Sequence, residues 1–188
     1  MARRSMREEI LESGVELFLE RGFNAAAVKD ITDRAGVPKG SFYNHFESKE
    51  ALAAVALERY GETRPVPLLR DESLAPVVRI RRHFESLGAE LSEYTKGCMY
   101  GNFAAEVVDH SEPLRLRVKG GLDYWSSALA ETIAAGQAAG EIRAGLDPER
   151  TARYLTSAWE GAILRARADK SGEAFDIFFD LTFSSLLA

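Results

Sequence analysis

Apolar residues recur along most of the chain at intervals of three and four, the period of an amphipathic α-helix. Leu11, Val15 and Phe18 follow this spacing in the first segment, whereas the alternation typical of a β-strand is almost absent. Ala, Glu, Leu and Arg, which favour helix, dominate the long segments. The pattern predicts an all-α protein of about nine helices, at residues 5–21, 28–35, 39–45, 48–62, 73–95, 101–110, 112–139, 148–169 and 173–187.

Several of these helices have recognisable ends. Ser5-Met6-Arg7-Glu8 has the form of a capping box, and Gly22 suits the end of the first helix. Asp147-Pro148 places a capping acid before a proline at the first helical position, which predicts the start of the eighth helix. Prolines punctuate residues 63–67, and we expect a domain boundary there or one helix earlier, giving domains 1–50 and 51–188.

Composition indicates a globular protein. The chain has 188 residues, 46% of them hydrophobic and 28% charged, which suffices for a core. Residues 1–49 carry equal numbers of basic and acidic side chains, so the net charge of −5 belongs to the rest. A single cysteine, Cys98, allows no internal disulfide, and no apolar run approaches the roughly 20 residues of a membrane helix. We therefore expect a cytoplasmic protein that does not span a membrane.

Residues 28–46 have the pattern of a helix-turn-helix. Two short helices are joined at Gly36, which can adopt a left-handed backbone. Phe42 and Phe46, spaced i and i+4, would anchor the second helix. The other residues from 39 to 45 must then face outward, and no carboxylate occurs among them: Lys39, Gly40, Ser41, Tyr43, Asn44 and His45. Such a surface favours a polyphosphate partner, because a nearby carboxylate would repel it.

The frame around this segment is more specific than the helix pair itself. It consists of Leu17-Phe18, Arg21-Gly22-Phe23, Val28-Lys29-Asp30-Ile31, Ala35-Gly36-Val37, Lys39-Gly40-Ser41-Phe42-Tyr43-Asn44-His45-Phe46 and Ser48-Lys49-Glu50-Ala51-Leu52. From residue 5 to about 55, the chain resembles the DNA-binding domain of the tetracycline-repressor (TetR/AcrR) family. The resemblance implies a homodimer that places recognition helices in the major groove of operator DNA. It also implies a C-terminal domain that dimerises and binds a small-molecule inducer, with no cofactor.

The same resemblance implies roles for individual residues. Tyr43 and Asn44 would reach bases or sugar-phosphate, and Lys49 would hold the DNA backbone. Where the family often has Thr or Ser, this chain has Ala27, so a phosphate contact is lost or moves to Lys29. The N-terminal arm either enters a groove or is only a basic chain end. The expected DNA-binding set is Arg3, Arg4, Lys29, Lys39, Gly40, Ser41, Tyr43, Asn44, His45 and Lys49.

The second part of the chain carries apolar helix faces that either form plain bundle core or line an inducer cavity. Gly97-Cys98-Met99 and the helix after it resemble a motif of a TetR subgroup that contains sensors of electrophiles and oxidants. The positive end of a helix dipole favours a thiolate at such a position, and the alternative is a buried structural thiol. The candidate ligand-binding residues are Phe84, Leu87, Cys98, Asn102, Glu106, Tyr124, Trp125, Trp159 and Arg167.

The final helix is too apolar for a free surface, so it packs in its own bundle or against a second chain. In the family the last two helices form the dimer interface, which implies that Tyr154, Ala158, Phe175, Phe178, Phe179 and Phe183 contribute to it.

An enzyme is the main competing class. The three histidines lack the Glu-x-x-His spacing of a di-iron bundle, and no phosphate loop, nucleophile elbow or zinc-type Cys/His set occurs. The prediction is therefore a DNA-binding regulator, most simply a repressor that an inducer releases from a pseudo-palindromic operator. The alternative is a helical ligand-binding dimer without a DNA function.

Overall fold

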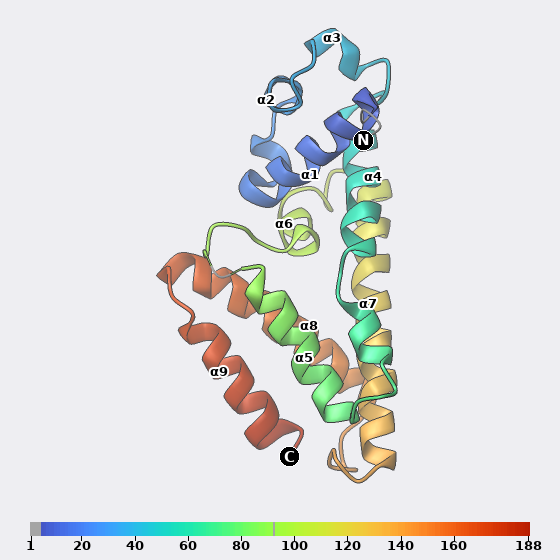
Figure 1. The fold of residues 1–188 in the computed structure, drawn as a ribbon, viewed down its shortest axis with the longest axis vertical. Helices are drawn as coiled ribbons and strands as arrows, with labels where there is room; N and C mark the ends of the chain where they lie inside the picture. The colour runs from blue at the N-terminus through green and yellow to red at the C-terminus, as the bar shows by residue number, and fades with distance from the viewer. Residues whose placement is uncertain (1–4, 92) are drawn as a thin grey trace. The chain divides into compact units, whose positions relative to one another are not determined.

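The computed structural model describes residues 5–91 and 93–188, and in this part of the chain all regular structure is helical (Figure 1). The prediction of an all-helical fold with nine α-helices is confirmed for these residues. In chain order they are α1 (Met6–Ala25), α2 (Val28–Arg34), α3 (Lys39–Phe42), α4 (Lys49–Glu62), α5 (Pro76–Ala89), α6 (Met99–Glu106), α7 (Glu112–Ala138), α8 (Pro148–Asp169) and α9 (Glu173–Leu181), with a 3₁₀ helix at Val66–Arg70 and a π-helical turn at Thr182–Leu186.

The helices form two compact units. The first comprises the residues up to Thr63 together with Cys98–Gly120, and the second comprises Arg64–Gly97 and Gly121–Ala188. Two helices that the sequence assigned to the C-terminal domain, α4 and α6, pack against α1 in the first unit. The helix-turn-helix is therefore supported by residues from two separate stretches of the chain.

Local capping explains where α1 and α4 begin. The Ser5 hydroxyl accepts a hydrogen bond from the Glu8 amide, and the Ser48 hydroxyl accepts one from Ala51 at the start of α4. Leu11, Leu17 and Phe18 of α1 are buried, as their helical spacing predicted. Their burial gives the unit a continuous apolar core.

In the second unit, α8 begins at the predicted residue, since Asp147 accepts a hydrogen bond from the Arg150 amide at 2.9 Å. The predicted helix at 73–95 is shorter than expected. It starts at Pro76, a residue suited to the first turn, and ends at Ala89. The 3₁₀ helix at Val66–Arg70 differs from the expected linker at residues 63–67: Pro65 precedes this helix and Pro67 lies in its first turn, where proline is tolerated.

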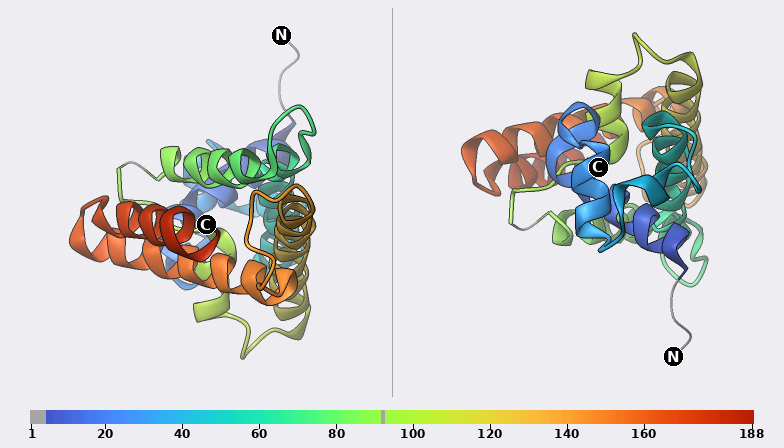
Figure 2. Two further views of the ribbon diagram at one scale, coloured as in Figure 1. Left: turned by 90° about the horizontal axis from the view of Figure 1, so that it is seen from below. Right: turned by 90° about the horizontal axis from the view of Figure 1, so that it is seen from above.

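Aromatic rings fill the core of the second unit. Phe84 of α5 lies 5.1 Å from Trp159 of α8 and 4.8 Å from Phe178 of α9, measured between ring centroids. Helices α8 and α9 run side by side, as Figure 1 and the left view of Figure 2 show. Among the described residues, no helix combines the length and the hydropathy needed to cross a membrane.

Candidate nucleic-acid interface

A tight turn sets the angle between α2 and α3. Gly36 has a φ of 67°, a backbone conformation that favours glycine. The Val37 amide donates to the Thr32 carbonyl at 3.0 Å and the Gly36 amide donates to Asp33, as in a helix C-terminal turn. The turn of the predicted helix-turn-helix therefore lies at Gly36, as expected.

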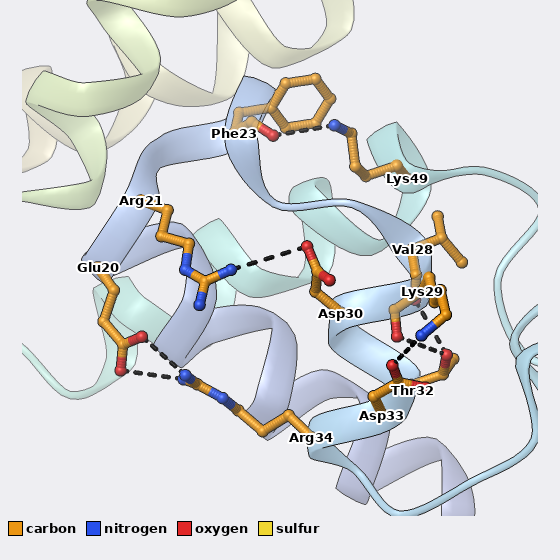
Figure 3. Close-up of polar contacts among 10 residues, drawn as sticks. All are labelled: Glu20, Arg21, Phe23, Val28, Lys29, Asp30, Thr32, Asp33, Arg34 and Lys49. Carbon is orange, nitrogen blue, oxygen red and sulfur yellow. Dashed lines mark hydrogen bonds and ion pairs between the residues drawn. The ribbon is translucent and has the colours of Figure 1, made fainter.

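Ion pairs fix α2 against α1 (Figure 3). The Arg34 guanidinium donates to both carboxylate oxygens of Glu20, at 2.9 and 2.8 Å, and these bonds raise the pKa of Arg34. Arg21 lies 3.7 Å from the Asp30 carboxylate. A two-pronged guanidinium contact restricts orientation as well as distance, so α2 is held at a defined angle.

Helix α3 is a single turn, Lys39–Phe42, that continues as a hydrogen-bonded turn to Phe46. Phe42 and Phe46 are buried with their rings 5.8 Å apart, whereas the Tyr43 side chain is 58% exposed. The residues next to the two anchors form what we call the recognition surface: Lys39, Gly40 and Ser41 before Phe42, and Tyr43, Asn44 and His45 between Phe42 and Phe46. All are exposed except Ser41, which is half-buried. The surface contains no carboxylate, and a Cβ at Gly40 would have no atom within 4 Å.

Two residues near the recognition surface, Lys29 and Ala27, do not present a free phosphate-binding group. Lys29 is exposed, but its ammonium group is paired with Asp33 one turn further along α2, which raises the pKa of Lys29. Ala27, the N-cap of α2, makes no side-chain hydrogen bond. The start of α2 therefore lacks the local cap that Ser or Thr would provide.

Lys49 does not extend freely toward solvent. Its ammonium nitrogen donates to the Phe23 carbonyl at 2.9 Å and lies 4.2 Å from the centroid of the Phe23 ring (Figure 3). Burial lowers the pKa of Lys49, against the opposing charges of Glu50 and Glu106. In this conformation Lys49 caps the end of α1 instead of presenting a free cation to phosphate.

Three candidate ligand residues lie on or next to α6 in the first unit. Asn102 donates to the Phe18 carbonyl at 3.5 Å, and Glu106 accepts from the Asn24 amide at 2.7 Å. Cys98 is the N-cap of α6 and is buried, with 8% of its surface exposed. Asn102 and Glu106 are therefore directed at α1, a role that helix periodicity alone could not reveal.

The other ligand candidates belong to the second unit. Phe84, Leu87, Trp125 and Trp159 are buried, and Arg167 is half-buried. Tyr124 is exposed, and its hydroxyl accepts a hydrogen bond from Arg70 at 3.2 Å.

Sequence reasoning missed His83, which is buried beside Trp125 and accepts a hydrogen bond from the indole nitrogen at 2.7 Å. The signal was available, because His83 lies on the apolar stripe of α5 one residue before Phe84. In the described ranges, no group of three or more His, Cys, Asp or Glu side chains is placed to hold a metal ion.

The expected dimer residues divide into two sets. Phe175 and Phe178 are buried on Trp159 within their own unit. Phe179 and Phe183 are half-buried and stack on each other. Tyr154 is exposed, and Ala158 lines a groove between α8 and α9.

Three further large apolar residues of α8 and α9 are exposed: Leu164, Ile177 and Leu181. Arg3 and Arg4, the predicted DNA-binding arm, lie outside the described residues.

A helix-turn-helix with an exposed, carboxylate-free second helix, carried on an all-helical chain, defines a DNA-binding regulator. Two family models agree. The model described as "Bacterial regulatory proteins, tetR family" matches residues 10–56, and "Tetracyclin repressor-like, C-terminal domain" matches residues 76–181. The chain belongs to the TetR family, whose members are transcriptional regulators that act as dimers on operator DNA.

Individual relatives extend over nearly the whole chain. It is 38% identical to the HTH-type transcriptional repressor DhaR of Mycobacterium sp. (strain GP1), covering 100% of this chain and 95% of the relative. It is 30% identical to the repressor NemR of Escherichia coli (strain K12), covering 90% and 88%.

Two solved structures are similar to the fold. The regulatory protein TetR from Rhodobacter sphaeroides has a TM-score of 0.90 and 29% identity, covering 97% of this chain and 99% of that one. The reduced form of E. coli NemR has a TM-score of 0.87 and 28% identity, with 98% of each chain covered.

Proposed function

We propose that the protein is a ligand-responsive transcriptional repressor that binds a pseudo-palindromic operator as a homodimer. The single observation that carries this proposal is the recognition surface, which is exposed, free of carboxylates and anchored by two buried phenylalanines. Phosphate groups are attracted to such a surface, and its amide, hydroxyl and ammonium groups can read base edges. Since operator DNA lies in the bacterial cytoplasm, we assign the protein to that compartment.

Within this surface we assign base contacts to Tyr43 and Asn44, and phosphate contacts to Lys39, Ser41 and His45. Gly40 lets the DNA backbone approach closely, because no side chain occupies the space beside it. We rank Lys29 below these residues, since phosphate binding must compete with its pairing to Asp33. These assignments follow the exposure and chemistry of each side chain.

We assign the dimer interface to the exposed side of α8 and α9. A groove of about 350 Å³ lies there, and large apolar residues remain exposed around it. Ala158 and Gly161 are small, so a second helix can approach closely at that point. Burial of Tyr154, Ile177 and Leu181 against a second copy would remove apolar surface from water. In this arrangement Phe175 and Phe178 support the interface from beneath.

For the inducer, we propose a small, predominantly apolar molecule that binds in the second unit beside Phe84, Leu87, Trp125 and Trp159. The one polar group of Trp125 is already bonded to His83, so the aromatic cluster offers mainly dispersion contacts. Because these side chains pack against one another, binding requires them to rearrange. The inducer acts by favouring the rearranged state, in which the two recognition helices no longer match their half-sites, about 34 Å apart.

The proposal is tested by enriching operators from a library of random duplexes with the purified protein. We expect a pseudo-palindromic motif whose binding weakens as salt increases. Asn44→Asp, which adds a carboxylate to the recognition surface with little change in size, should reduce affinity for that motif at least tenfold. Ser127→Asp, an exposed position on α7 in the second unit, changes net charge equally and should leave affinity within about twofold. An enriched pool without a motif, or equal effects of the two variants, would contradict the proposal.

A further inference from the structure

Helix α6 is attached to α1 along its length, although more than 70 residues separate the two helices in sequence. The Phe103 ring lies edge-on to Phe18 and Phe23, with centroid distances of 5.4 and 5.7 Å. Asn102, beside it, donates to the Phe18 carbonyl. The apolar contact fixes the depth of α6 on α1, and the polar contact fixes its register.

Glu106, the last residue of α6, lies against the corner where α1 ends. The chain breaks from helical geometry at Gly22, with a φ of 79° and a ψ of 178°. A Cβ at Gly22 would lie only 1.8 Å from Glu106 Oε1, while Oε2 accepts from the Asn24 amide at 2.7 Å. At this corner, the absence of a side chain at Gly22 leaves space for the Glu106 carboxylate, and the Asn24 amide donates a hydrogen bond to it.

The same corner is held from its other side by α4. Lys49 donates to the carbonyl of Phe23, the residue between Gly22 and Asn24. An amide and a carbonyl of adjacent residues are thus bonded to side chains from two different helices, one anionic and one cationic. These bonds involve charged groups and are stronger than neutral ones.

The position of α2 depends on this corner as well as on the ion pairs of Arg34 and Arg21, which hold α2 against α1. Only three residues separate Asn24 from Val28, the first residue of α2, and the N-cap Ala27 makes no side-chain hydrogen bond. With no local cap, the start of α2 is positioned mainly by the contacts of α1 and its corner. A shift of the corner would move α2 and, through the turn at Gly36, the recognition surface.

From these contacts we infer that Glu106 is a positioning residue for operator binding: its carboxylate on α6 fixes the α1–α2 corner and thereby the recognition surface. This inference rests on the proposed function. It assigns a role in DNA recognition to a residue that lies 50 positions beyond the end of the matched DNA-binding segment at residue 56. Glu106 itself does not contact DNA in this scheme.

The test compares three substitutions of Glu106 in the full-length protein. Glu106→Ala removes the acceptor, and Glu106→Asp keeps the charge but shortens the side chain by one methylene so that it no longer reaches Asn24. Glu106→Gln keeps both the length and an acceptor oxygen. Glu112→Ala is the matched control, because Glu112 is an exposed carboxylate at the start of α7 that pairs only locally with Arg115 among the contacts observed.

Affinities are measured by fluorescence anisotropy for the library-enriched operator and for a scrambled duplex of equal length. We expect Glu106→Ala and Glu106→Asp to weaken operator binding about tenfold, and Glu106→Gln by no more than about threefold. Binding to scrambled DNA should change less than about twofold, since it depends on charge and not on the precise orientation of α3. The control should resemble the wild type on both duplexes.

Two results would overturn the inference. One is operator binding by Glu106→Ala and Glu106→Asp that equals that of the wild type. The other is an equal loss on both duplexes together with a lower melting temperature, which would indicate only a folding role. If Glu106→Ala does not fold, the contrast between Asp and Gln decides in the same way. A wild-type protein that shows no preference for any duplex would instead refute the proposed function itself.

Discussion

Replacing His83 by Gln should flatten the dependence of stability on pH between about 7 and 4. The Trp125 indole nitrogen can only donate, so His83 Nε2, 2.7 Å away, must be the acceptor of this bond. The ring proton is then on Nδ1, which donates to the Pro65 carbonyl at 3.1 Å. Both nitrogens are thus used by the neutral imidazole, and protonation would break the bond from Trp125.

The magnitude follows from burial. His83 is 1% exposed, and desolvation lowers its pKa from the ordinary 6.5 to about 4, with a further contribution from the Arg64 charge and opposition from the Pro65 carbonyl. The unfolded chain therefore binds this proton more tightly than the folded protein. Stability from His83 is fully present above pH 6.5 and is lost as pH falls toward 4, by about 1.4 kcal/mol per pH unit and about 3 kcal/mol overall.

Urea unfolding at fixed protein concentration, followed by tryptophan fluorescence from pH 7 to 4.5, measures this difference. At pH 7 we expect His83→Gln to be less stable by about 1–3 kcal/mol, because the Pro65 carbonyl loses its donor. The two unfolding free energies should converge as pH falls, since carboxylate titration is common to both proteins. His110→Gln, at an exposed histidine, should follow the wild type. Parallel curves for wild type and His83→Gln would refute the reasoning.

Four further predictions concern DNA binding, regulation and assembly. Tyr43→Ala should reduce operator affinity at least tenfold while affinity for scrambled DNA is retained, as measured by anisotropy. Lys49→Met should lower the unfolding free energy by about 1–2 kcal/mol and leave the salt dependence of DNA binding unchanged. Lys39→Ala should reduce the slope of log binding constant against log salt concentration by about one. A similar loss of slope in both variants would make Lys49 a phosphate contact. Cys98→Ser should bind the operator normally but resist release by N-ethylmaleimide. Because the Cys98 thiol is buried, the wild type should react slowly with this reagent. Equal release of both proteins would exclude a thiol sensor. Ile177→Asp should shift the sedimentation profile toward monomer, and an unchanged dimer would place the interface elsewhere.

Much of the fold could be read from local signals. Asp147-Pro148 predicted the start of α8 because an N-cap and a proline act within one turn of chain. Gly36 predicted the turn because its constraint is the backbone dihedral of one residue. The long segment at 73–95 was predicted poorly, since apolar spacing continues through Leu91 although the helix ends at Ala89. Periodicity indicates a face but not where a helix must stop.

The candidate site likewise has features that local sequence signals predict and features that they do not. The spacing of Phe42 and Phe46 predicts the recognition surface, because the residues beside and between two anchors buried on one helix face must point outward. Lys49 was predicted to hold the DNA backbone, and its position in the sequence supports that reading. In the structure its ammonium group is bonded to Phe23, since a long flexible side chain takes whichever acceptor the packing supplies.

Local signals in the sequence were enough to locate most of the helices, the turn at Gly36 and the recognition surface, and to indicate a class of DNA-binding regulators. Each depends on interactions within a few residues, or on a pattern that covers the whole segment. Three features became visible only once the helices were packed together: Glu106 faces Gly22 and Asn24, Phe175 and Phe178 are internal, and Ile177 is exposed. These facts depend on which helix faces meet, because an apolar or charged face can pack against several partners equally well until the whole chain has folded.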